Sequence, residues 1–368
     1  MADLGTSVTV LDAAGRAQVS ALLVSDPGFG KTSLVTALAQ ADQVPMQVLI
    51  GSQRDPVEVG GWPWMNHDTG VVTRSVPDWA GPLIAANGGY LLLDELNTAS
   101  AATQAAMLTV ALERVAGSAP LPDAVRIVAA MNPPDRSAGG VELAAPMANR
   151  FLHIDFEPTA AEWLTGMRGG FVTPASRAVS ADPARIAEEV GLVTAFIEAR
   201  PELLHRLPDN EVDAGRAWPS RRSWRATAQV LARLRPDDAA AVQTAVFGLV
   251  GDGTGSEYVE WRAALDLPPV LDVLADPSVM DWEGARPDQV WAVLSAVTAW
   301  AAGQGSQSAW IEAWGPLVAA ATGGAPDVAG AAARSLAVSR PPKAKVPAAA
   351  RKFRDVLIAA GLDTEAAA

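Results

Sequence analysis

Short apolar runs alternate with helix-like segments over the first 156 residues of the chain. Between the first two runs, residues 34–39 place apolar side chains at the spacing of an α-helix. Strands interleaved with helices predict an α/β fold with a parallel sheet and helices on both of its faces. The runs with the length and composition of buried strands are residues 21–24, 46–50, 90–93, 125–131 and 151–156.

After residue 157 the local signals become helical. Thr159 and Glu162 are spaced as a capping box, and similar helix starts recur farther along the chain. We therefore expect residues 1–157 to form an α/β core and residues 158–266 to form an α-helical lid.

Residues 267–368 exceed what a core and a lid require. Val290, Leu294 and Val297 lie on one face of a predicted helix, and several tryptophans accompany the region. Tryptophans in such a setting are more often core or interface anchors than a ligand site. A basic, proline-rich segment covers residues 339–354. We interpret it as a solvated linker that docks on the acidic body of this same protein, with binding of RNA, DNA or the acidic surface of a partner as the alternative.

Composition narrows the possible chemistry. The chain has no Cys and only 3 His among 368 residues, which excludes disulfides, thiol nucleophiles and zinc–thiolate sites. The net charge is −13, but residues 328–354 hold seven basic residues and no acid. The remainder has 21 basic against 41 acidic residues, or −20, and a body this acidic repels a nucleic-acid backbone. No apolar run is long enough to cross a membrane and no signal peptide is evident, so we expect a cytoplasmic protein.

The distribution of lysine singles out one position. Of 28 Lys and Arg residues only four are Lys, and the first 342 residues contain 22 Arg but a single Lys, Lys31. Arg presents a broad planar fork, whereas Lys is a slim stem that ends in a compact charge. An isolated Lys in a sequence that otherwise uses Arg indicates a site where only the slimmer side chain fits.

Lys31 follows a glycine-bearing loop. The segment Ser25-Asp-Pro-Gly-Phe-Gly-Lys-Thr32 joins the first predicted strand to a helix, which is the context of a phosphate-binding loop. Backbone N–H groups of such a loop surround a polyphosphate, while Lys31 reaches the terminal phosphates and Thr32 binds Mg²⁺. The pattern departs from the usual one at its first position, where Ser25 replaces Gly. The residues assigned to nucleotide contact are Asp26, Pro27, Gly28, Phe29, Gly30, Lys31, Thr32 and Ser33.

Two adjacent carboxylates end another predicted strand. Residues on a strand alternate between its faces, so Asp94 and Glu95 are expected to point to opposite sides. Asp94 is then placed to hold the Mg²⁺ shell and Glu95 to polarise an attacking water. Asn132 follows the strand 125–131 and is placed to bridge the γ-phosphate and that water, because ligands of parallel sheets bind beyond the carboxyl ends of the strands.

Five motifs follow one another along the chain as they do in AAA+ ATPases, and the chain resembles more narrowly the MoxR family. The resemblance covers roughly residues 18–156. It implies a five-stranded sheet of order 5-1-4-3-2, a ring that is usually a hexamer, and ATP bound between neighbouring subunits. The motifs are Asp26-Pro-Gly-Phe-Gly-Lys-Thr32, Glu58-Val-Gly-Gly61, Leu91-Leu-Leu-Asp-Glu-Leu-Asn-Thr-Ala-Ser100, Ala-Ala-Met-Asn-Pro133 and Ala-Asn-Arg-Phe151.

Carried over by position, the resemblance implies Walker A roles for Lys31 and Thr32, Walker B roles for Asp94 and Glu95, and the sensor 1 role for Asn132. These implied roles agree with the ones read from the residues themselves.

Two arginines complete the site that the resemblance implies. Arg150 matches the arginine finger that reaches a neighbour's nucleotide, a contact worth about 10³–10⁵ in rate. Arg222, near the start of a helix that Ser220 caps, matches sensor 2, which points at the γ-phosphate. Arg221 stands where the family usually has Pro, so the choice between Arg221 and Arg222 stays open.

The resemblance also places an inserted loop or hairpin near residues 60–76, facing the channel of the ring. Trp62, Trp64 and Met65 are candidates to contact a partner or client chain there. An equally weighted alternative is that the two tryptophans pack the base of the insert.

Three hypotheses of function follow. The first is a MoxR-like ATPase that binds and hydrolyses Mg-ATP at the subunit interfaces of a ring and so remodels, activates or assembles a partner protein. The resemblance implies that such a partner often contains a von Willebrand factor A domain. The second is a non-catalytic assembly module that ATP switches, with the Trp-rich C-terminal region as its docking site. The third, a nucleic-acid translocase, is disfavoured by the acidic body.

Overall fold

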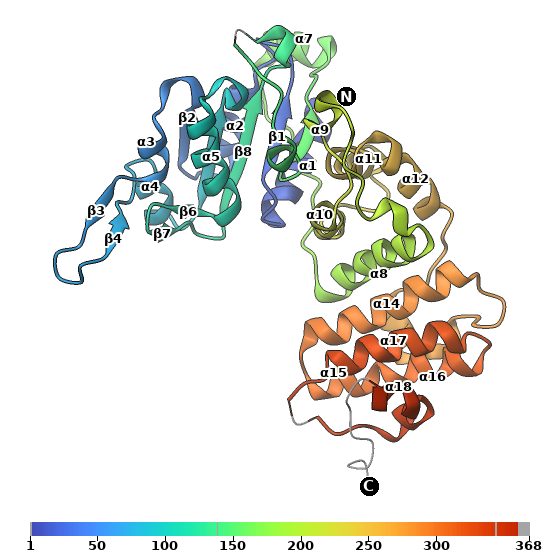
Figure 1. Ribbon diagram of the computed structural model, residues 1–368. Helices are drawn as coiled ribbons and strands as arrows, with labels where there is room; N and C mark the ends of the chain where they lie inside the picture. Colours follow the sequence, from blue (N-terminus) through green and yellow to red (C-terminus); the bar gives the residue numbers. More distant parts are fainter. Residues whose placement is uncertain (1, 138, 343, 360–368) are drawn as a thin grey trace. The chain divides into compact units, whose positions relative to one another are not determined.

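The computed structural model describes residues 2–137, 139–342 and 344–359 (Figure 1). The chain divides into two compact units. Unit 1 consists of Met1–Val179 and Arg206–Gly255, and unit 2 of Ser180–His205 and Ser256–Ala368. The division expected at residues 157 and 266 stays a prediction, and the compact units do not follow it, because the stretch between those positions contributes to both units.

Unit 1 is built on one parallel sheet. The order of its strands is β2-β5-β8-β1-β9, and every neighbouring pair is parallel, which confirms the predicted α/β fold. The labels differ from the expected 5-1-4-3-2 because short hairpin strands also take numbers. Counted within this sheet alone and read from β9, the order is fifth, first, fourth, third, second. The strands are β1 (Ala21–Val24), β2 (Met46–Ile50), β5 (Gly89–Asp94), β8 (Val125–Met131) and β9 (Leu152–Asp155).

Helices cover this sheet and bury its apolar strands. Leu22, Leu91 and Leu93 are fully buried in one cluster with Met107 and Val110 of α5. The first helix, α1, precedes the sheet and is not predicted by the sequence analysis. The helices of unit 1 are α1 (Leu4–Arg16), α2 (Lys31–Ala41), α3 (Pro56–Gly60), α4 (Ala80–Ala85), α5 (Ala101–Glu113), α6 (Ala145–Ala148), α7 (Ala160–Gly169), α9 (Glu211–Ala214), α10 (Arg221–Leu231) and α11 (Ala239–Val250).

Helix α11 packs directly on the backbone of β9. A Cβ atom at Gly248 would lie 2.0 Å from the carbonyl oxygen of His153, so this close approach requires glycine.

His153 is itself buried, and its Nε2 lies 2.8 Å from the carbonyl oxygen of Ala148. Burial lowers the pKa of His153 to about 4. His153 is therefore a neutral residue of the core.

A hairpin projects from unit 1 between α3 and α4, where the resemblance places an insert (Figure 1). Its strands are β3 (Pro63–Met65) and β4 (Val72–Arg74), paired antiparallel. Trp62, Trp64 and Met65 are 63%, 51% and 53% exposed. The interpretation that the two tryptophans pack the base of the insert is therefore wrong. A second, shorter hairpin consists of β6 (Val115–Ala116) and β7 (Ala119–Pro120).

Unit 2 is helical. Trp310 and Trp314 are fully buried and pack edge to face, with ring centroids 5.5 Å apart, and Trp282 is buried in the same cluster. These three residues confirm the interpretation of the tryptophans as core anchors. The helices are α8 (Pro183–Ala199), α13 (Val270–Ala275), α14 (Pro287–Gln304), α15 (Gln307–Glu312), α16 (Trp314–Thr322), α17 (Pro326–Val338) and α18 (Arg354–Ala359), and α12 (Asp252–Ala263) begins at the limit between the units.

The predicted apolar face of α14 is also confirmed, because Val290, Leu294 and Val297 are buried. Of the basic segment 339–354, Lys343 lies outside the described residues. Within the described ranges, no helix has both the length and the apolar character needed to cross a membrane.

Candidate functional site

The loop from β1 to α2 has the backbone conformation that its glycines permit. Gly28 and Gly30 have φ angles of +86° and +85°, in the left-handed region that side-chain-bearing residues rarely adopt. Lys31 is the first residue of α2, so the N–H groups at the helix start face the same space as the loop. This arrangement suits the binding of an anion.

The ammonium group of Lys31 is held by neutral oxygen atoms. Its Nζ donates to the carbonyl oxygen and to the Oγ of Ser25, both at 3.0 Å, and to Oδ1 of Asn132 at 2.7 Å. Lys31 is only 8% exposed. Burial lowers its pKa, against the opposing effects of Asp94 and Asp26. Ser25, the departure from the usual loop pattern, thus supplies two of the lysine's acceptors.

Thr32 and Asp94 come together at the carboxyl edge of the sheet. Thr32 Oγ1 donates to Oδ2 of Asp94 at 2.8 Å. A hydroxyl and a carboxylate oxygen are ligands that Mg²⁺ prefers, and this ion is usually held by one or two protein groups together with phosphate oxygens. In the part of the chain that the structure describes, no cluster of three metal-ligating side chains occurs. The pair therefore fits a magnesium ion that arrives with a phosphate ligand.

Glu95 lies beyond the end of β5 rather than on the strand. Its φ of +55° puts it in the left-handed region, and Oδ1 of Asp94 accepts its backbone N–H at 2.9 Å. The expected strand alternation of Asp94 and Glu95 is therefore wrong, because a turn sets the direction of the Glu95 side chain. Ser52 Oγ donates to Oε2 of Glu95 at 2.5 Å. Ser52 follows β2 at the same sheet edge, which is the only sequence signal that could have drawn attention to it.

Asn132 is fixed from both sides. Besides the contact of its side chain with Lys31, its carbonyl oxygen accepts from Nδ2 of Asn97 at 3.0 Å. Asn97 is almost fully buried. The sequence analysis assigns no role to Asn97, although it stands two residues after Glu95 in the motif of adjacent carboxylates.

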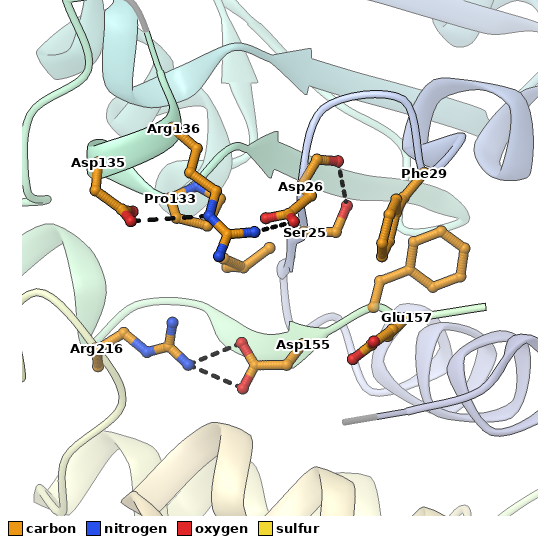
Figure 2. Close-up of a pocket in the computed structure, with 11 residues that line it drawn as sticks. Ser25, Asp26, Phe29, Pro133, Asp135, Arg136, Asp155, Glu157 and Arg216 are labelled. Atoms are coloured by element: carbon orange, nitrogen blue, oxygen red, sulfur yellow. Dashed lines mark hydrogen bonds and ion pairs between the residues drawn. The ribbon is translucent and has the colours of Figure 1, made fainter. Parts of the chain in front are cut away.

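A cavity of about 440 Å³ opens beside the phosphate loop (Figure 2). Asp26 and Phe29 of the loop line it, and an ion pair joins Asp26 to Arg136. On the opposite wall, Nη2 of Arg216 donates to both carboxylate oxygens of Asp155 at 2.8 Å. Arg136 and Arg216 are absent from the sequence-based assignments, because neither belongs to a recognisable motif.

The two predicted arginines are close enough for their charges to interact. Arg150 Nη1 donates to the carbonyl oxygen of Pro146 at 2.7 Å, and Arg222 is exposed in the first turn of α10. Burial lowers the pKa of Arg150, and the positive charge of Arg222 lowers it further. Among the described residues, no hydrogen bond or ion pair joins either arginine to the phosphate loop.

One family model matches the part of the chain that contains this site. Residues 20–153 match the model of a family described as the ATPase family associated with various cellular activities (AAA). No curated protein matches the chain. Among solved structures, the chain is similar to a presumed ATPase from Cytophaga hutchinsonii, with 17% identity, a TM-score of 0.38, and coverage of 70% of this chain and 81% of that chain. The family match covers residues 20–153 and supports ATPase activity for the chain.

Proposed function

We propose that the chain is a MoxR-like AAA+ ATPase that hydrolyses Mg-ATP at the subunit interfaces of a ring and uses the energy to remodel, activate or assemble a partner protein. The observation that carries this proposal is the convergence of Lys31, Thr32, Asp94 and Asn132 at one edge of the sheet. A cytoplasmic location belongs to the same proposal.

Each of these residues has a defined task in the proposed reaction. The loop amides and Lys31 bind the β- and γ-phosphates, and Thr32 and Asp94 hold the magnesium ion. Bound Mg²⁺ supplies positive charge that stabilises the developing charge on the phosphate oxygens. Glu95 accepts a proton from the attacking water. Asn132 orients that water against the γ-phosphate.

Arg150 completes the site of the neighbouring subunit. Its only hydrogen bond within the described residues is to a backbone carbonyl, and no carboxylate neutralises it. A guanidinium group without a counter-charge is available to a phosphate that another subunit brings. Such a donation makes turnover dependent on assembly, and a hexameric ring is the arrangement that we propose.

The hairpin β3–β4 is the proposed contact with the client. Large exposed apolar side chains on a projecting element mark interaction surfaces, and Trp62, Trp64 and Met65 meet that description. A protein with a von Willebrand factor A domain is the partner class that the family resemblance suggests.

Substitution of Glu95 tests the chemistry. Glu95→Gln removes the base but keeps the shape, so the variant is expected to bind ATP and lose about 10²–10⁴ of its turnover. Arg150→Ala is expected to lose turnover in the assembled state while the nucleotide affinity of one isolated subunit is unchanged. Phosphate release and equilibrium ATP binding are the measurements. Undiminished phosphate release from Glu95→Gln would remove Glu95 from the role of base.

ATP binding with turnover, and a separate nucleic-acid binding assay, distinguish the other two hypotheses. Clear ATP binding by the assembled wild-type protein without any turnover would identify a non-catalytic assembly module. Steeply salt-dependent binding of DNA or RNA would favour a translocase, against the acidic charge of the body.

A further inference from the structure

Asn149 connects the residue before Arg150 to the start of α10. Its Nδ2 donates to the carbonyl oxygen of Trp218 at 2.6 Å, and its Oδ1 accepts from Oγ of Ser220 at 2.6 Å. Asn149 and Ser220 are 8% and 5% exposed, so water competes little for these hydrogen bonds. Both polar ends of the amide are thus used to bind one short segment that is distant in sequence.

The same segment caps α10. Ser220 Oγ accepts from the backbone N–H of Ser223 at 3.1 Å, and Ser223 Oγ accepts from the backbone N–H of Ser220 at 2.8 Å. The hydroxyl that caps the helix is therefore also the one that binds Asn149. Arg222 lies between the two serines, so its backbone cannot move relative to that of Arg150 without breaking buried hydrogen bonds.

The charges around Arg150 indicate what the connection through Asn149 does. Two like charges are held close enough for Arg222 to lower the pKa of Arg150. The Nε atom of Arg150 is buried and has no hydrogen-bond partner in the described residues. No ion pair within the described ranges involves Arg150, Arg221 or Arg222, although most of the protein is acidic. A shared anion would relieve the repulsion.

We propose that Asn149 is a positioning residue that joins Arg150 and Arg222 into one phosphate-binding pair, so that both arginines act on the same γ-phosphate, that of the neighbouring subunit. This inference rests on the proposed function, and it adds to it the residue that holds the two arginines together. Asn149 acts only through the two arginines and does not contact the nucleotide.

The first test asks whether the two arginines form one unit. If they share a phosphate, turnover of Arg150→Ala/Arg222→Ala falls to about the level of the worse single variant, because residues that act as a unit are strongly non-additive. If they serve different nucleotides, the losses multiply. A double variant whose loss equals the product of the two single losses would overturn the pairing.

The second test asks whether Asn149 acts on the neighbour. Mixed assemblies of wild-type and Glu95→Gln subunits stay active at the wild-type sites, because Glu95→Gln subunits still donate arginines. Replacing the latter by Glu95→Gln/Asn149→Ala subunits is expected to lower turnover per wild-type subunit about tenfold, since small misplacements of catalytic groups have such effects. Unchanged turnover in assemblies of equal size would refute the positioning role.

Two further variants separate positioning from folding. Asn149→Asp keeps the acceptor for Ser220 but loses the donor to Trp218, and is expected to give an intermediate loss in kcat with little change in KM. Asn210→Ala removes a similar amide from the exposed cap of α9 and is the matched control, with turnover unchanged. A loss of kcat in Asn149→Ala that only follows a loss of thermal stability, and that Asn210→Ala reproduces, would contradict the proposal.

Failure of this inference is distinguishable from failure of the proposed function. If Arg150→Ala alone leaves turnover of the assembled protein intact, the proposed finger role is wrong. If Arg150→Ala abolishes turnover but the mixed assemblies do not respond to Asn149→Ala, only the positioning role is wrong.

Discussion

The two ends of the central sheet use charged side chains differently. At the amino ends of β5 and β8, Arg126 forms ion pairs of 2.9 and 2.8 Å with Asp12 and Asp42, and the Tyr90 hydroxyl donates to Asp42 at 2.8 Å. At the carboxyl ends, the positive group is Lys31, and it contacts only neutral oxygens. Helix α2 connects the two ends, since it begins at Lys31 and is followed by Asp42.

The contrast separates stabilising charges from binding charges. Arg126 is neutralised by carboxylates of the same chain, so it needs no ligand. Lys31 is buried among neutral oxygen atoms without an ion-pairing carboxylate in the described residues, so in the proposed function a triphosphate supplies the missing negative charge. Substitutions at the first end should therefore change stability and leave turnover intact, and substitutions at the second end should do the reverse.

Lys31→Met provides the largest expected effect. Loss of the Lys31 charge should lower turnover about 10³-fold and weaken ATP binding, because a cation that contacts the transferred phosphate is removed. Thermal stability should change little. Lys31→Arg is the matched variant. It keeps the charge but is expected to lose turnover as well, since the broader guanidinium does not fit the narrow space around Lys31, which is only 8% exposed. Wild-type turnover in Lys31→Arg would contradict the steric argument.

Arg126→Met should have the opposite effect. It removes the ion pairs with Asp42 and with the nearly buried Asp12, which keeps only Arg16 as a partner in the described residues, and should lower the free energy of unfolding by about 2 kcal/mol. The kcat for ATP should be unchanged when it is measured well below the melting temperature. Arg235→Met breaks the exposed pair with Asp237 and serves as a control that is expected to keep wild-type stability.

Alkaline titration of Tyr90 examines the amino ends of β5 and β8, where Arg126 is paired with carboxylates. Burial raises the pKa of Tyr90 above its usual value of 10, and a hydrogen bond to Asp42 raises it further against the effect of Arg126. A phenol whose pKa is higher in the fold stabilises the protein fully below pH 10 and loses that contribution as the pH rises. The chain has 2 Tyr, and burial raises the pKa of the other, Tyr258, as well. Tyrosinate absorbance should therefore appear only together with unfolding.

Tyr90→Phe is the control for this titration. It should shift the alkaline unfolding transition while leaving the absorbance of Tyr258 to report on unit 2. Tyrosinate absorbance in the folded wild-type protein near pH 10 would contradict the predicted protection.

Ser52→Ala should have the smallest effect. The Ser52 hydroxyl donates to Oε2 of Glu95 and so competes with the attacking water for that oxygen. Removing the hydroxyl is expected to raise basal turnover about fivefold, which corresponds to one hydrogen bond of ~1 kcal/mol. Ser52→Thr keeps a hydroxyl and should behave as the wild type. A drop in turnover in Ser52→Ala would instead indicate that Ser52 aligns Glu95 for catalysis.

The sequence predicts the parts of the site that one continuous segment contains. The loop around Lys31 and the strand ends at Asp94 and Asn132 are recognisable because strand, loop and helix follow one another. Ser52 and Asn97 could not be assigned, because their roles come from the packing of strands that are distant in sequence. The left-handed turn at Glu95 was also hidden, since five apolar or acidic residues before it read as a continuing strand.

The fold shows the same limit. Alternation of strands and helices predicts the sheet, and the family resemblance implies the inserted loop or hairpin, but the exposure of Trp62 depends on what surrounds it in space. Division of the chain into units was hidden for a similar reason, since residues 180–205 pack with a distant part of the sequence.

Gly248 has a mechanical consequence. The backbone of α11 contacts the backbone of β9 at Gly248, and the Asn149 amide binds the segment just before α10. These two contacts hold the stretch from α10 to α11 against β9, the last strand of the sheet. This stretch cannot rotate as a rigid body against β9 when nucleotide is exchanged. Such a rotation would press the backbone at Gly248 into the carbonyl group of His153 or break the hydrogen bond from Asn149 to Trp218. Any hinge that opens and closes with hydrolysis therefore belongs elsewhere in the chain.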